Sequence, residues 1–540
     1  MYLPIIIFVV VITIFAVTIA SKIQSNKKMR SDLVSDFGKP PNKRNTEFES
    51  ISKYYNHTKQ DSTHIDKITW NDLDMDSVFE RVNTCKSSVG EEYLYSILHQ
   101  PENKLNKLED RERLIKLFAD DSNARLEAQY AMAKLGKLNY NGIAYLIFSS
   151  DTKILRWSGL YSFLAVCPIL SIIAMFINLN IGIAGIILSF LVNLFVHYHT
   201  VKSVNSDLPT VGYFSSMMRC IKRLLRIKEL SSRPIGETLT RLYGVFKTVA
   251  SNAPSATSGM GGDAVDMFWT YFTILFLYDV RHYNKLMQKI SKNSETFHEV
   301  FKILGEIEVA LAVLSFRKSL PTFTQPTFHD ENKLCFTDIY HPLIENPVTN
   351  TYEVKRNILL TGSNASGKST FIKTLAINGI LAQTIYTCTA TQFSARFSHV
   401  VTAMAVQDNL QEGDSYFVVE LKSLKRIIDL AKERFCICYV DEILRGTNTV
   451  ERIAAATAVL EYLHKQNCIC IAASHDIELT KLLAENYENL NFSEYVTEEG
   501  IKFDYKLKQG ASATRNAIKL LKVIGFADDI TERAEQMARE

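Results

Sequence analysis

Long uncharged apolar stretches alternate with polar and periodic segments along the chain. Residues 1–21 carry no charge and are rich in Ile, Val and Phe, and residues 157–201 are uncharged when histidine is neutral. The first stretch is long enough for one membrane span, and the second for two spans of about 20 residues each. The pattern therefore predicts a transmembrane helix at 1–21 and a transmembrane helical hairpin at 155–200, with Asn178-Leu179-Asn180 as its turn.

The flanking charges give these spans an orientation. Lysine and arginine residues follow the first stretch and bracket the second: Lys22, Lys27, Lys28, Arg30, Lys153, Arg156 and Lys202. The positive-inside rule then predicts a multi-pass membrane protein whose N-terminus is outside and whose remaining domains are cytoplasmic. Two alternatives stay open at this point. The first stretch could be a cleaved signal peptide, although it lacks a basic start, and the second could be a buried hairpin of a soluble domain.

The remaining segments differ in the period of their apolar residues. Residues 22–68 are polar and include Pro40-Pro41, which is typical of a linker. Apolar residues recur at helical spacing in 69–150 and in 201–330, so these segments are predicted to form an all-α core domain and its lever-like continuation. From 331 to 540, strand-like and helix-like runs alternate, which favours an α/β domain.

A phosphate-binding loop begins this last domain. The apolar run that ends at Thr361 is followed by G-x-x-x-x-G-K-S and then by a helical pattern. Gly362 and Gly367 let the backbone N–H groups face the phosphates of ATP, Lys368 reaches the β- and γ-phosphates, and the Ser369 hydroxyl is placed to ligate Mg²⁺. A glycine turn between a strand and a helix would not explain Lys-Ser-Thr at its end.

Two further motifs complete an ATPase constellation. A second apolar strand ends in Asp441-Glu442, and a third is followed by His475. Asp441 is expected to hold Mg²⁺, and Glu442 to polarise the attacking water. His475 is expected to contact the γ-phosphate and respond to its loss. The order of loop, acidic pair and histidine predicts hydrolysis of ATP.

Charge and cysteine content change this picture little. The chain has 61 basic and 58 acidic residues, so its net charge of +3 gives no global sign of nucleic-acid binding. A basic amphipathic helix at 213–230 could contact anionic lipid or phosphates, or could simply be solvated. The pairs Cys436/Cys438 and Cys468/Cys470 lie in apolar strands, which favours small core residues over a metal site.

The motifs resemble those of the MutS DNA mismatch-repair family, most closely in its ATPase domain. The similar segments are Thr361–Thr370, Asp408–Glu420, Val440–Thr449, Ser474–Leu479 and Lys508–Ser512, with a looser likeness in Lys86–Pro101 and Gly305–Phe328. The resemblance implies an ABC-like, MutS-type P-loop NTPase that works as a homodimer. It adds Asn364 and Thr370 to the ATP-binding residues, and it places Ser415 against the ATP of the partner chain. Leu444 stands where the family has glycine.

The resemblance does not reach the family's mismatch-reading domain or a full DNA clamp. DNA binding is thus left open, and mismatch specificity is not expected. The favoured hypothesis is a membrane-anchored, MutS-like ATPase in which ATP closes a dimer and hydrolysis releases it. The alternatives are an ATPase associated with ABC-type transport, and a membrane scaffold that uses ATP as a switch.

Overall fold

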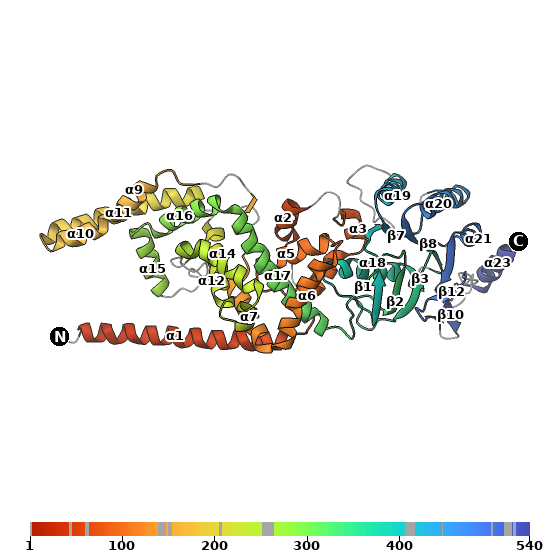
Figure 1. The fold of residues 1–540 in the computed structure, drawn as a ribbon, viewed down its shortest axis with the longest axis horizontal. Coiled ribbons are helices and arrows are strands. Elements are labelled where there is room, and N and C mark those ends of the chain that lie inside the picture. Colours follow the sequence, from red (N-terminus) through yellow and green to blue (C-terminus); the bar gives the residue numbers. More distant parts are fainter. Residues whose placement is uncertain are drawn as a thin grey trace.

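The computed structural model describes residues 3–42, 46–59, 64–138, 147–148, 154–204, 208–250, 264–363, 366–404, 416–444, 447–497, 500–511, 521 and 525–539. The protein is elongated, with apolar helices at one end, a helical core in the middle and an α/β domain at the other end (Figure 1). The two termini lie at opposite ends of the long axis (Figure 1).

The polar segment after the first apolar stretch is not a linker, which corrects the prediction for 22–68. Helix α1 runs without a break over Leu3–Asp36, and α2 follows over Phe48–Thr58. The charged half of α1 packs on α7 (Ser122–Leu135), where Arg30 pairs with Glu127 and lies 4.2 Å from the ring centre of Tyr130. In α2 the buried residues Ile51, Tyr54 and Tyr55 form an apolar stripe at helical spacing.

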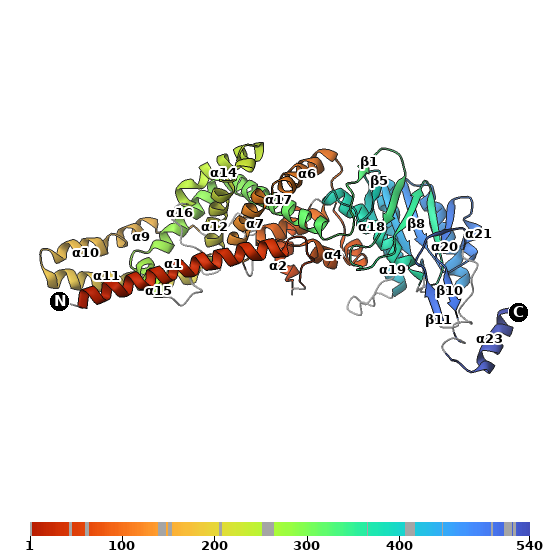
Figure 2. The same ribbon diagram turned by 90° about the horizontal axis from the view of Figure 1, so that it is seen from below.

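The predicted hairpin is present, but its first arm is broken. It consists of α9 (Ser158–Leu164), α10 (Cys167–Met175) and α11 (Leu179–Val204), and it projects toward the same end of the molecule as the start of α1 (Figures 1 and 2). Among the described residues, Ser158–Met175 and Leu179–Val204 are long and apolar enough to cross a membrane by length and composition, with mean hydropathies of 1.9 and 2.2. Whether they do so remains a prediction.

Pro168 explains the break. Proline has no N–H, so it cannot donate to the carbonyl of Leu164 four residues earlier. The side chain of Asn193 on α11 donates to that carbonyl instead, at 3.2 Å, and to the carbonyl of Leu275 at 2.6 Å. The buried Asn193 thus provides hydrogen bonds to the last carbonyl groups of two helices, α9 and α15 (Ala264–Leu275), inside an apolar region.

The core consists of helices from both sides of the hairpin. They are α3 (Lys67–Asp72), α4 (Met75–Val82), α5 (Ser88–His99), α6 (Leu105–Asp120), α7, α12 (Leu208–Leu224), α13 (Lys228–Ser231), α14 (Pro234–Ala250), α15 (Ala264–Leu275), α16 (Tyr278–Lys292) and α17 (Ser294–Lys318). The helix predicted at 213–230 therefore ends earlier, at Leu224. Helix α17 packs against α4, α5, α6, α7, α14 and α16, and most of its residues are buried.

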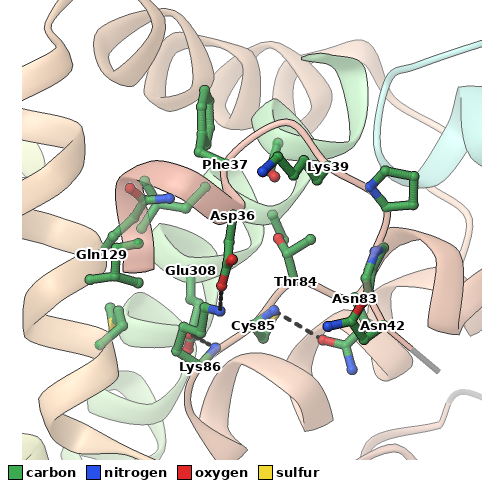
Figure 3. Close-up of a pocket in the computed structure, with 17 residues that line it drawn as sticks. Asp36, Phe37, Lys39, Asn42, Asn83, Thr84, Cys85, Lys86, Gln129 and Glu308 are labelled. Atoms are coloured by element: carbon green, nitrogen blue, oxygen red, sulfur yellow. Dashed lines mark hydrogen bonds and ion pairs between the residues drawn. The ribbon is translucent and has the colours of Figure 1, made fainter. Parts of the chain in front are cut away.

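A buried carboxyl group joins α17 to the start of α5. Glu308 accepts hydrogen bonds from the backbone N–H groups of Lys86, at 2.6 Å, and Ser87, at 3.0 Å, and the Ser87 hydroxyl also donates to it. Figure 3 shows this carboxyl group beside a cavity of about 290 Å³ that the end of α1 also lines. On the same wall, the ammonium of Lys86 pairs with Asp36 at 3.5 Å.

Replacing Glu308 with Gln is expected to flatten the pH dependence of stability. Burial raises the pKa of Glu308 from 4.5 to about 7, and its hydrogen bonds only partly oppose this. Protonation therefore favours the folded state, and this contribution is full below the unfolded pKa and lost as pH rises through about 7. Between about pH 5 and 8, the wild type should lose about 2–3 kcal/mol more than Glu308→Gln in denaturant unfolding. Parallel pH profiles for the two proteins would contradict this.

The α/β domain contains two main sheets. Its strands are β1 (Thr327–Phe328), β2 (Leu334–Ile339), β3 (Asn350–Val354), β4 (Asn357–Thr361), β5 (Gln392–Ala395), β6 (His399–Ala403), β7 (Cys436–Asp441), β8 (Cys468–Ala473), β9 (Tyr487–Asn491), β10 (Glu494–Thr497), β11 (Gly500–Phe503) and β12 (Lys508–Gln509). Its helices are α18 (Lys368–Thr384), α19 (Tyr416–Glu433), α20 (Thr449–His464), α21 (Glu478–Leu482) and α23 (Asp528–Arg539).

The larger sheet has the order β12-β9-β4-β8-β7-β6, in which β9, β4, β8, β7 and β6 are parallel. Every residue of β4 and β7 is buried, which accounts for their continuous apolar sequences. The smaller sheet has the order β1-β5-β2-β3, and β10 pairs with β11 as a separate ribbon. The cysteines of β7 and β8 lie side by side within the core, as predicted from their spacing.

The helical core and the α/β domain meet through a buried ion pair. Arg317, near the end of α17, donates two hydrogen bonds to Glu112 of α6, at 3.0 and 2.7 Å. The same guanidinium donates to the Thr387 hydroxyl at 2.8 Å and to the Tyr386 carbonyl at 2.9 Å, just after α18. Because one side chain contacts both regions, the end of α17 is fixed to the α/β domain.

Candidate nucleotide-binding site

The predicted phosphate loop connects the central strand β4 to α18. Gly362 has φ = +138°, and a Cβ on this residue would lie 2.4 Å from the Phe492 carbonyl oxygen, so only glycine fits. Gly367 has φ = +100° at the start of the helix. The ammonium of the buried Lys368 donates to the carbonyls of Gly362, at 2.5 Å, and Ser363, at 2.8 Å, which places a cation at the loop.

The first turn of α18 carries the other described residues of the motif. Ser369 is half-buried and Thr370 is exposed. The Ser366 hydroxyl donates to the Ser363 carbonyl at 2.7 Å, which closes the loop on itself. Asn364 and Ser415, both predicted to contact ATP, lie outside the described residues.

The acidic pair lies at the end of β7, one strand removed from β4. In the register of the parallel sheet, Ala473 of β8 lies opposite Asp441 of β7 on one side and opposite Leu360 of β4 on the other. The carboxyl ends of these parallel strands therefore meet at one edge of the sheet, where α/β proteins bind ligands. Among the described residues, the buried Oδ1 atom of Asp441 has no hydrogen-bond partner. An unsatisfied carboxylate oxygen at this position suits a hard cation such as Mg²⁺.

Two residues after β7 have left-handed backbone conformations, Glu442 with φ = +60° and Leu444 with φ = +59°. Leu444 thus adopts the conformation that a glycine at this position would favour, at a cost of about 1–2 kcal/mol. Burial of its side chain and a hydrogen bond from its N–H to the Glu420 carboxylate oppose this cost. Packing and this hydrogen bond therefore hold Leu444 in a conformation that leucine rarely adopts. Such strain is common at functional sites.

The predicted histidine contacts the predicted acid. His475 Nε2 lies 2.5 Å from Glu442 Oε1, and the Glu442 side chain is 6% exposed whereas His475 is 39% exposed. The backbone N–H of Glu442 donates to the Ala473 carbonyl at 2.9 Å, which ties the acid to β8. The geometry therefore holds Glu442 in one orientation and leaves His475 accessible from outside.

Sequence reasoning missed the residues that support this pair. Arg452 of α20 makes two hydrogen bonds to Asp476, at 2.9 and 2.7 Å, and so fixes the turn that carries His475. Glu420 holds the turn after the acidic pair. The Tyr505 ring lies against Gly367, since a Cβ there would be 3.0 Å from Tyr505 Cδ1. Asp476 directly follows His475 in the sequence, and this adjacency was the one local sign that Asp476 helps to position the histidine.

The residues present fit a nucleotide with its metal ion. A lysine ammonium, a glycine-dependent loop at a helix start and an unsatisfied carboxylate converge on one edge of the sheet. These groups complement phosphate oxygens and a divalent cation respectively. Lys368, Ser369 and Asp441 are the side chains that would hold them.

The α/β domain is similar in sequence to known proteins. Residues 358–540 match the family model described as MutS domain V. The chain is similar to the DNA mismatch repair protein MutS of Thermus thermophilus, with 30% identity over 259 residues that cover 47% of this chain and 31% of that protein. The MutS of Pseudothermotoga lettingae is 32% identical over 267 residues, which cover 47% and 33%. The MutS of Natronomonas pharaonis is 27% identical over 271 residues, which cover 48% and 31%.

The chain therefore spans about a third of the length of these curated relatives. The predicted resemblance to the MutS family is confirmed for this part of the chain, and so is a P-loop ATPase domain. The roles of single residues, the homodimer, the domain boundaries and the membrane location stay predictions.

Proposed function

We propose, on the premise that residues 358–540 form a MutS-type ATPase domain, that this protein is an Mg²⁺-dependent ATPase anchored in a membrane. One observation carries the catalytic part of the proposal. The Lys368 ammonium, the unsatisfied Asp441 oxygen and the Glu442–His475 pair lie at the same edge of one parallel sheet. These groups suit phosphoryl transfer to water, which depends on positioning and charge stabilisation.

Bound ATP would supply the phosphoanhydride, and Mg²⁺ would supply a positive charge that stabilises the negative charge developing on the phosphates. Lys368 would turn from the loop carbonyls to the β- and γ-phosphates, where its charge stabilises the negative charge of the transition state. The Ser369 hydroxyl and Asp441 would hold the metal ion. Glu442 would orient water and accept its proton, while His475 would keep Glu442 in place and contact the γ-phosphate.

The homodimer belongs to the same proposal. Ser415 directly precedes α19 in the sequence, and in a paired arrangement it would contact the γ-phosphate held by the partner chain. ATP would then close the dimer, and hydrolysis would release it.

Membrane anchoring is supported by the two candidate spans, whose residues are largely exposed. Apolar side chains exposed over such a length need a cover, and a bilayer supplies one. In this orientation the ATPase domain is cytoplasmic. DNA is a proposed partner only through the names of the relatives, and mismatch specificity is not part of the proposal.

The test is the ATPase rate of the detergent-purified protein with homoduplex, mismatched or branched DNA, over a salt series. Wild-type protein should hydrolyse ATP, and Lys368→Ala should lower the rate about 100-fold or more because it removes a charge that stabilises the transition state. Stimulation by DNA that weakens with salt would support DNA coupling. If no DNA changes the rate of ATP hydrolysis, the ATPase would be assigned to a membrane or protein partner. An unchanged rate in Lys368→Ala would refute the assigned site.

A further inference from the structure

Helix α1 packs on α7 in an antiparallel register that two contacts define. Near the end of α1, the Phe37 ring lies 4.2 Å from the guanidinium carbon of Arg125. Seven residues earlier, Arg30 stacks on Tyr130, so the contact moves toward the end of α7 as α1 is followed backward. Lys22 lies about two turns before Arg30 on α1, and Lys134 lies one turn after Tyr130 on α7. The two ammonium groups are close enough for the charge of Lys22 to lower the pKa of Lys134.

Helix α12 brings arginines to the same place. It crosses α7 in the opposite direction, since the Tyr213 hydroxyl donates to the Gly136 carbonyl at 2.8 Å while Cys220 lies 3.7 Å from Met132. Arg219 and Arg223 are four residues apart and thus share one face of α12. We define the cation cluster as Lys22, Lys134, Arg219 and Arg223, contributed by three helices.

Three members of the cation cluster, Lys22, Lys134 and Arg223, have no acidic partner among the described residues. In the part of the chain that the structure describes, no carboxylate lies within 4.0 Å of Lys22, Lys134 or Arg223, and the nearby Glu127 is paired with Arg30. Burial lowers the pKa of Lys134, and repulsion from Arg223 and Lys22 lowers it further. Side chains from three separate helices thus hold like charges together, which favours an anionic ligand.

The position of the cluster identifies the kind of anion. Lys22 is the first charged residue after the uncharged residues 1–21. Both ribbon views place the start of α1 at the same end of the molecule as α10 and α11, which hold the candidate spans (Figures 1 and 2). If those helices lie in a bilayer, the cluster lies at the level of the lipid headgroups.

We propose that the cation cluster binds the phosphate headgroups of anionic phospholipids at the surface of the membrane in which the protein is anchored. This inference rests on the proposed membrane anchoring and adds its lipid partner. Juxtamembrane cations attract anionic lipid by about fivefold in affinity per charge. Duplex DNA is the less favoured ligand, because Lys22 directly follows the uncharged residues 1–21 and because α1, α7 and α12, which carry the cluster, lie away from the ATPase domain (Figure 1).

The test measures binding of soluble short-chain phosphatidylglycerol and phosphatidylcholine to the full-length protein in uncharged detergent. The wild type should prefer phosphatidylglycerol, and the preference should weaken with salt. Lys134→Gln with Arg223→Gln should weaken phosphatidylglycerol binding about 25-fold. Lys116→Gln is the matched control, since Lys116 is an exposed lysine on α6, and it should change nothing.

Three outcomes would overturn the proposal: equal affinity for the two lipids, an unchanged double variant, or duplex DNA that binds the cluster and excludes the lipid. Inorganic phosphate is tested as a competitor, and competition at concentrations as low as those of the lipid would assign the site to free phosphate instead. Retention in phosphatidylcholine nanodiscs is measured separately. Loss from these discs would refute membrane anchoring, whereas retention without a preference for phosphatidylglycerol would refute only the cation cluster.

Discussion

Replacing Glu442 with Gln is expected to lower ATP turnover about 100-fold or more while leaving ATP binding intact. The amide has nearly the same shape as the carboxylate, so it can keep the contact with His475 at 2.5 Å. It cannot accept a proton from the attacking water. Lys368 and Asp441, which would hold the phosphates and the metal ion, are untouched. Single-turnover hydrolysis and equilibrium binding of ATP, measured on the same preparation, separate the two effects.

Glu485→Gln is a suitable control, because Glu485 is an exposed carboxylate in the same domain. It should hydrolyse ATP at the wild-type rate. If Glu442→Gln also does so, Glu442 has no part in the chemistry, and an ATP-switched scaffold becomes the better account. A loss of ATP binding in Glu442→Gln would instead mean that the carboxylate stabilises the loop.

Replacing Arg317 with Met is expected to lower the free energy of unfolding by about 3–5 kcal/mol. Arg317 and Glu112 are only 4% and 7% exposed, so the substitution leaves a buried carboxylate without its cation. It also removes the hydrogen bonds to Thr387 and to the carbonyl of Tyr386. Because these groups belong to the α/β domain, its attachment to α17 should weaken first. Denaturant unfolding followed by limited proteolysis would show both effects.

The same helix offers a matched comparison. Glu299 of α17 pairs with Arg241 at the surface, where the side chains are 41% and 57% exposed. Arg241→Met should cost no more than about 1 kcal/mol, since water and salt screen such pairs. If both variants lose the same free energy of unfolding, burial does not determine how much the Arg317–Glu112 ion pair contributes to stability.

Local spacing was sufficient to predict which residues meet at the candidate site. The phosphate loop, the acidic pair and His475 follow directly after strands, and adjacent parallel strands bring their ends together. Spacing could not predict which other residues hold these side chains in position. Arg452 lies 24 residues from its partner Asp476, and the left-handed conformation of Leu444 contradicts the preference of leucine. Such features depend on tertiary contacts that override local propensity.

The helical part was harder to predict for the same reason. Residues 22–36 look like a polar linker because their partners are distant in sequence, as with Arg30 and Glu127, which are separated by 97 residues. Pro168 is visible in the sequence as a break in an apolar run. The side chain that satisfies the freed carbonyl, Asn193, is known only once α11 lies beside α9.

The continuity of α1 has a mechanical consequence. A helix of 34 residues is a stiff shaft about 50 Å long, whereas a linker of equal length would absorb any movement applied to it. Just past its end, the Gly38 N–H donates to the Ser315 hydroxyl at 3.1 Å, two residues from Arg317 on α17. A rotation of α17 would therefore act directly on the base of α1, and any tilt of this stiff helix would move its apolar end farther than its base.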